Sequence, residues 1–266
     1  MLILIQKLFT VFLLCAISMA GLAAPMQPKN NARPTVVVLM AEQKGDRDQI
    51  LPLTRNVLQL FSYLEESAQI KIDIRRYPWR RVLHNGENGE GLIFGIYKTP
   101  ARLKSFHFSE PVYSDKVWLL SRCEDNLQFN SIQDLKGKKI GIVQGSSAGE
   151  EFDSQVNVIF KAEYNTSSLA GRFLKLYQKR MDAFLLYEPR TNLKELQKEL
   201  NQLYASEIDE YKKKKNDIFC ILPRPVSVID AYFAISLQAD KTQLNKIDKV
   251  LLQAKKSGDL DRLFAK

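Results

Sequence analysis

Two short segments carry side chains that could do chemistry, and each follows an apolar run. The first is Thr99-Pro100-Ala101-Arg102 and the second is Gly145-Ser146-Ser147-Ala148-Gly149. Thr99 can cap a helix and Pro100 can take its first position, which would put Arg102 in the first turn. A guanidinium there can hold a carboxylate through two parallel hydrogen bonds. An arginine that simply faces solvent is the plainer interpretation, and the residues alone leave both open.

The glycine-serine segment 145–149 fits G-x-S-x-G, the turn that presents the nucleophile of serine hydrolases. Such hydrolases place their histidine after the serine, whereas His84 and His107 both precede it here. The same segment has a simpler use, because backbone N–H groups and hydroxyls at a helix start favour an anion. We therefore expect a small anion held between Arg102 and this segment rather than hydrolysis.

Metal binding has little support in the sequence. The distant histidines and the cysteines lack the spacing of a ligand set, and no EF-hand loop is present. We predict no metal, no cofactor and no catalytic residue. Glu188 and His107 are the only candidates for a general acid or base, should the protein be an enzyme.

The first 24 residues have the features of a secretory signal peptide. Lys7 precedes the apolar stretch 8–19, which is too short for a bilayer span, and small residues follow at positions 20, 21, 23 and 24. We expect cleavage near Ala23 or Ala24 and a mature protein in the periplasm.

The formal net charge is +9. For a chain in the cytosol, this charge would suggest nucleic acid as a partner. After export it fits an anionic small ligand or an anionic envelope surface better, and solvated basic faces are the plainest interpretation. We therefore expect no nucleic-acid partner.

The segment 75–81 interleaves four arginines with two aromatic residues. Nucleic-acid binding would use such a mixture for phosphate contact and base stacking, but export argues against it. Trp79 and one arginine could instead lie at a cleft, on the first turn of a helix that Pro78 opens. Alternatively, the arginines face solvent while Trp79 packs inward.

Two cysteines, Cys123 and Cys220, remain once Cys15 leaves with the signal peptide. An even number of cysteines in an oxidising compartment favours a disulfide between them. Two buried thiols are the alternative, because free cysteine packs as a small hydrophobe.

Apolar periodicity predicts two successive series of strands and helices joined by an extended stretch. The predicted strands are 35–40, 70–74, 92–96, 117–122, 138–143, 156–162, 182–187, 219–222 and 231–236. The predicted helices cover 52–64, the residues after Pro78 and after Thr99, 148–154, 169–177, 193–203 and 244–257. This pattern indicates an α/β protein of two lobes, with the chain crossing near 117–122 and returning near 228–236. Ligands of open α/β sheets bind at the carboxyl ends of the strands, and the segments 99–102 and 145–149 both follow predicted strands.

Several blocks, in their order and spacing, resemble bacterial extracellular solute-binding protein family 3. These are the polar amino-acid type of periplasmic binding proteins that serve ABC importers. The blocks are Thr99-x-x-Arg102, His107-Phe108-Ser109-Glu110-Pro111-Val112-Tyr113, the run from Asp134 to Ser146, Trp79-Arg80-Arg81 and Tyr232-Phe233-Ala234-Ile235-Ser236.

The resemblance implies a two-lobed periplasmic binding protein type 2 fold, in which each lobe is a mostly parallel sheet flanked by helices and hinge strands join the lobes. Lobe 1 would comprise residues 34–118 and 234–266, and lobe 2 residues 119–233. By the same resemblance, Arg102 would grip a ligand carboxylate, and Ser146 and Ser147 would close onto that group from lobe 2. Tyr97 and Trp79 would supply further contacts.

The sequence departs from the family pattern where amino-acid binders commonly carry an aspartate for the ligand ammonium. Here the matching position is Tyr187, with Glu188 beside it. The loop 41–48 also lacks the family's usual aromatic and proline residues. Glu188 could replace the missing carboxylate, or the ligand has no ammonium group.

The resemblance therefore implies a periplasmic protein that captures a small polar, carboxylate-bearing ligand and delivers it to the membrane permease of an ABC importer. We expect a monomer that is not an enzyme. The alternatives are a dehydratase-like enzyme on the same scaffold and a periplasmic sensor partner of a membrane receptor.

Overall fold

The computed structural model describes residues 33–45, 49–165, 168–205 and 216–264. The signal peptide predicted for residues 1–24 lies outside the described residues. Within the described part of the chain, no helix has the length and hydropathy that a membrane crossing requires.

The first series of elements follows the predicted order of strand, helix and strand. It comprises β1 (Thr35–Ala41), α1 (Arg55–Ser67), β2 (Lys71–Tyr77), α2 (Trp79–Glu87) and β3 (Leu92–Tyr97). Strand β1 lies between β2 and β3 and is parallel to both. Its continuous apolar sequence fits this central place, because helices cover both faces of a parallel sheet.

The helix predicted after Thr99 is wrong in length, since only the 3-10 turn η1 (Arg102–Lys104) forms there. The Thr99 hydroxyl still accepts the Arg102 N–H, at 3.2 Å. The turn is short because β4 (Phe106–Arg122) begins immediately afterwards and pairs from its first residue with β9 (Ser227–Ser236).

The second series repeats the pattern after two 3-10 turns, η2 (Cys123–Asp125) and η3 (Ile132–Leu135). It comprises β5 (Lys139–Val143), α3 (Glu150–Asp153), β6 (Lys161–Asn165), α4 (Leu169–Tyr177), β7 (Ala183–Glu188), α5 (Leu193–Tyr204) and β8 (Phe219–Ile221). The strand predicted at 156–162 begins late, because Asn157 has a φ of 63° and the chain turns between Val156 and Phe160. After β9, α7 (Thr242–Ser257) and α8 (Asp259–Phe264) end the described chain.

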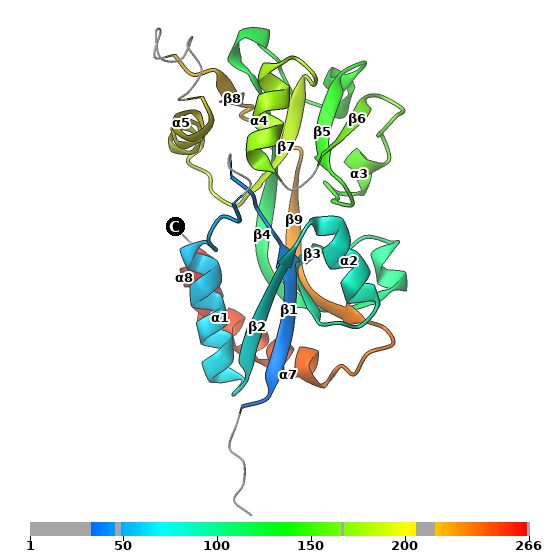
Figure 1. The fold of residues 1–266 in the computed structure, drawn as a ribbon, viewed down its shortest axis with the longest axis vertical. Helices are drawn as coiled ribbons and strands as arrows, with labels where there is room; N and C mark the ends of the chain where they lie inside the picture. The colour runs from blue at the N-terminus through cyan, green and yellow to red at the C-terminus, as the bar shows by residue number, and fades with distance from the viewer. Residues whose placement is uncertain (1–32, 46–48, 166–167, 206–215, 265–266) are drawn as a thin grey trace, which may run out of the picture. The chain divides into compact units, whose positions relative to one another are not determined.

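The strands form one hydrogen-bonded sheet of nine within the described residues, rather than two separate sheets. Its order is β2-β1-β3-β9-β4-β7-β5-β6, with β8 paired to β4 (Figure 1). The long strands β4 and β9 are antiparallel to each other, and their hydrogen bonds connect the strands of the first series to those of the second.

The hydrophobic cores lie along this sheet in two groups, one group in each lobe. Val112 of β4 packs with β1, α1 and α7 residues, whereas Val117 packs with β5, α3 and β7 residues. The side chains of β4 therefore change core between these two positions. The lobe boundaries at 118/119 and 233/234 stay predictions.

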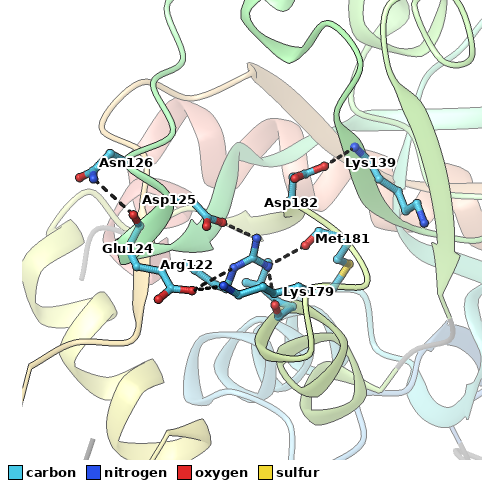
Figure 2. A network of polar contacts seen from close by, with 9 residues as sticks. Arg122, Glu124, Asp125, Asn126, Lys139, Lys179, Met181 and Asp182 are labelled. Atoms are coloured by element: carbon cyan, nitrogen blue, oxygen red, sulfur yellow. Dashed lines mark hydrogen bonds and ion pairs between the residues drawn. The ribbon is translucent and has the colours of Figure 1, made fainter. Parts of the chain in front are cut away.

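Arg122, at the end of β4, shows how a buried charge is accommodated in lobe 2 (Figure 2). Arg122 is 6% exposed, and its guanidinium donates to the carbonyl oxygens of Leu176 and Met181, at 2.5 and 2.8 Å. It also forms an ion pair with Asp125, and Glu124 lies 3.9 Å away. The next residue, Cys123, forms a disulfide with Cys220 of β8.

Candidate functional site

Each lobe has a point where the strand order reverses, and the predicted site residues follow the strands there. In lobe 1 the chain passes from β1 to β2 on one edge and then to β3 on the other; in lobe 2 it passes from β5 to β6 and then to β7. Ligands of open α/β sheets bind at such points, outside the carboxyl ends of the strands. Strand β3 ends at Tyr97, β5 at Val143 and β7 at Glu188.

The Gly145 carbonyl joins the two lobes. It accepts a hydrogen bond from the Trp79 indole Nε1 at 3.0 Å and another from Arg102 Nη2 at 2.8 Å. Arg102 Nη1 donates to the Tyr97 carbonyl at 2.8 Å, and its Cζ lies 5.7 Å from the Trp79 ring centroid. The guanidinium thus spans a carbonyl of each lobe, with no acidic partner among the described residues.

Burial lowers the pKa of the Arg102 guanidinium, and the nearby Tyr187 and Asp153 oppose this shift. An arginine remains charged at neutral pH all the same. Its present partners are two separate neutral carbonyls, whereas one carboxylate accepts two parallel hydrogen bonds from a guanidinium and adds the attraction of opposite charges. A carboxylate can therefore displace both carbonyls.

The two serines of the segment 145–149 have different surroundings. Ser146 is partly exposed, and its hydroxyl accepts from the Tyr187 phenol at 3.0 Å. Ser147 is buried and donates to Asp153, whose other carboxylate oxygen accepts the Ala148 N–H at 2.9 Å. Ser146 is therefore placed for a ligand contact, whereas Ser147 shapes the loop.

Tyr97 and Tyr187, one from each lobe, stack with their ring centroids 5.8 Å apart. The Tyr97 phenol donates to Asp115 of β4 at 2.6 Å, and Asp115 is only 5% exposed. Burial raises the pKa of Asp115 to about 6; the Tyr97 hydrogen bond opposes the shift and the charge of Glu188 adds to it. Asp115 is thus a buried acid beside the stacked tyrosines.

Glu188 already has a cationic partner. Its carboxylate accepts the Arg190 N–H at 3.2 Å and forms an ion pair with the Arg190 guanidinium at 3.0 Å. His107 cannot act with it, because Lys116 pairs with Glu188 and His107 lies nine residues earlier on β4. An extended strand of that length spans on the order of 30 Å.

The structure brings together Arg102, Trp79, Tyr97, Ser146 and Tyr187. Sequence reasoning did not single out the Gly145 carbonyl, Asp115, Asp153 or Arg172. One signal was available for Arg172, since it lies in the apolar stripe of α4 with Leu169, Phe173 and Leu176.

Residues 57–266 match the sequence model of the bacterial extracellular solute-binding proteins, family 3. The chain belongs to this family. Among its relatives, the arginine-binding extracellular protein ArtP of Bacillus subtilis (strain 168) is 23% identical over 214 residues. That alignment covers 79% of this chain and 75% of ArtP.

Solved structures with the same fold include the substrate-binding protein AbpA of an amino acid ABC transporter from Streptococcus pneumoniae, bound to L-arginine. Its TM-score is 0.63 at 19% identity, over 87% of this chain and 93% of AbpA. The GluR0 ligand-binding core of Nostoc punctiforme, in complex with L-glutamate, has a TM-score of 0.61 at 18% identity, over 86% of this chain and 97% of that core. The ancestral protein AncCDT-1, a precursor of cyclohexadienyl dehydratase, has a TM-score of 0.63 at 18% identity, over 87% of this chain and 94% of AncCDT-1. The predicted type 2 periplasmic binding protein fold is confirmed.

Proposed function

We propose that this protein captures a small polar, carboxylate-bearing ligand between Arg102 and the segment 145–147, and delivers it to the membrane permease of an ABC importer. On this proposal the protein acts in the periplasm as a monomer and breaks no bond. The single observation that carries the proposal is the position of Arg102, whose guanidinium spans carbonyls of the two lobes at the carboxyl ends of their strands.

The ligand carboxylate would take the place of the two carbonyls on the Arg102 fork. Bidentate binding of a carboxylate by arginine adds geometric specificity to affinity. Ser146 would then donate its hydroxyl to the ligand, and Trp79 would cover it from lobe 1. Closure would result because one ligand group has partners on both lobes.

Support for an amino acid or a related acid comes from the family and from the relatives named above, two of which carry L-arginine or L-glutamate. The Glu188 carboxylate is neutralised by Arg190, so Asp115 is the better candidate to meet a ligand ammonium.

A thermal-stabilisation screen tests this proposal, because a ligand that binds only the folded state raises apparent stability. Amino acids, organic acids and sugars would be compared at matched concentration. We expect compounds with a carboxylate to raise the melting temperature and their amide or ester forms to have no effect. Stabilisation by neutral sugars alone would contradict the proposal.

A dehydratase-like enzyme is the second candidate function, and the likeness of the fold to AncCDT-1 is what suggests it. The separation of His107 from Glu188 disfavours it, as does the engagement of Glu188 by Arg190. Product formation from a stabilising ligand during overnight incubation would overturn the binding-only proposal. A sensor role would be indicated if the ligand-bound protein associated with a membrane receptor and with no permease.

A further inference from the structure

Arg172 is a buried cation without an acidic partner among the described residues. It is 8% exposed, and the only hydrogen bond that its guanidinium makes to a described residue runs from Nη1 to the Leu185 carbonyl at 3.0 Å. Its Cζ lies 5.1 Å from the Phe184 ring centroid, and its Nε has no hydrogen-bond partner. The buried Arg122 of the same lobe, by contrast, has Asp125 as an ion-pair partner.

A buried charge without a counterion is costly, which is why buried arginines are usually paired. Burial lowers the pKa of Arg172 to about 10, so the guanidinium is still charged at neutral pH. A fold that needed only a helix contact at this position could use an apolar residue, as it does at Leu169, Phe173 and Leu176. The charge therefore calls for a partner that the described residues do not supply.

The guanidinium lies where a ligand of lobe 2 is expected. Strand β5 pairs with β7 only as far as Gly141 and Phe184, so the Leu185 carbonyl lies just beyond the last pair. This is the point where the strand order of lobe 2 reverses, and crevices of this kind bind ligands. Leu185 is two residues before Tyr187, the phenol of the candidate site.

Electrostatics connects Arg172 to the rest of the site. Burial raises the pKa of the Tyr187 phenol, and the positive charges of Arg172 and Arg102 both oppose that shift. Tyr187 therefore lies within reach of two cations, one from each lobe. The negative charge of Asp153 also raises the pKa of Tyr187. Both Asp153 carboxylate oxygens, however, already accept hydrogen bonds, one from the Ser147 hydroxyl and one from the Ala148 N–H.

We propose that Arg172 is a second anion-binding residue of the cleft and that the ligand is a dicarboxylic acid, one acidic group binding Arg102 and the other Arg172. The inference rests on the proposed function and narrows its ligand class. Opening of the stacked Tyr97 and Tyr187 rings would expose the crevice, and the second carboxylate would take the free donors of Arg172.

Calorimetric titration with matched acids and amides tests the inference directly. The probes are L-glutamate against L-glutamine and succinate against succinamate, which differ in one negative charge at nearly constant shape. Hydrogen bonds to charged groups contribute about 1.5 to 3 kcal/mol, so we expect the diacid to bind about 10- to 100-fold more tightly than its amide. This comparison uses the unaltered protein and does not depend on the folding of a variant.

Three variants assign the preference to a residue. Arg172→Gln should reduce the diacid preference to less than about threefold, and Arg172→Lys should retain part of it, because the charge remains while the fork is lost. Arg180→Gln, which removes an exposed charge from the same lobe, should retain the full preference for the diacid over its amide.

Amides that bind as tightly as diacids, or a preference that survives Arg172→Gln, would overturn the inference and leave the proposed function standing. The inference also fails, with the proposed function intact, if some other monocarboxylate binds while none of the four probes does. If no carboxylate compound binds, the proposed function itself fails.

Discussion

At the residue scale, the Gly145 carbonyl explains why Trp79 and Arg102 belong to one site. Each donates to the same oxygen, so a ligand bound as proposed would replace that oxygen for both donors. The inward packing that the sequence left open for Trp79 is observed, and its place at a ligand site stays a prediction. Its ring is buried in the core of lobe 1, while its indole N–H reaches lobe 2.

Trp79 should therefore report ligand binding by its fluorescence. The chain has two tryptophans, and Trp118 donates to the Glu188 carbonyl at 3.1 Å within the core of lobe 2. We expect a carboxylate ligand to change the emission of the native protein and of Trp118→Phe. The change should be lost in Trp79→Phe; a signal that remains there would place the ligand elsewhere.

Asp115 should give the protein a characteristic pH dependence of stability. Its pKa is raised from 3.8 to about 6, mainly by burial, so the folded state keeps a proton that the unfolded state loses between these values. This acid therefore contributes most to stability below about pH 4, and the contribution is lost as the pH rises through 6. The loss amounts to about 3 kcal/mol at most.

Urea unfolding between pH 4 and 7 measures this dependence as the difference between the native protein and Asp115→Asn, which cannot titrate. Tyr97→Phe serves as a second variant. Since the Tyr97 hydrogen bond opposes the shift, removing it should move the transition to higher pH. Parallel pH curves for native protein and Asp115→Asn would contradict this account of Asp115.

At the element scale, most strands and helices could be predicted because their apolar periodicity is local. The errors lie where a longer-range demand decides the outcome. The helix after Thr99 is cut short by the pairing of Phe106 with Ser236, and two sheets become one because β4 and β9 continue through both lobes.

In the candidate site, too, some residues follow local motifs and others depend on contacts with distant parts of the chain. Arg102, Trp79 and Ser146 follow local motifs at strand ends and could be predicted from the sequence. Asp115 could not, because its importance depends on burial against Tyr97, 18 residues earlier in the chain. The role of Ser147 likewise depends on Asp153, which a motif of five residues does not include.

The disulfide should contribute strongly to the stability of lobe 2. It links residues 97 positions apart, from the end of β4 to β8. In the chain-entropy account, closing a loop of that length stabilises the fold by up to about 4.7 kcal/mol. We expect the Cys123→Ser, Cys220→Ser double variant to lose several kcal/mol of unfolding free energy in urea.

The oxidised protein treated with a reductant provides the control, because it loses the same bond without a substitution. Equal stability with and without reductant, together with equal thiol titres in native and reduced unfolded protein, would show that the bridge does not form in solution.

At the scale of the whole molecule, the central claim is that one guanidinium joins the two lobes through the ligand. Lobe 1 supplies Arg102 and Trp79, and lobe 2 supplies the backbone and hydroxyl of the segment 145–147. Binding and closure would then be a single event, which suits a protein that presents its closed form to a permease. Delivery to a permease is the proposed role, and family membership is what supports it.

The most direct measurement is the affinity of Arg102→Gln for the carboxylate compound that stabilises the native protein most. Loss of a charge-assisted pair costs about 1.5 to 3 kcal/mol and bidentate geometry adds to this, so we predict a fall in affinity of about 100-fold or more by calorimetry. The ligand-free variant should remain folded, since only two hydrogen bonds to carbonyls disappear, each contributing about 1.5 to 3 kcal/mol of unfolding free energy at most. Retained affinity in a folded Arg102→Gln protein would contradict the account.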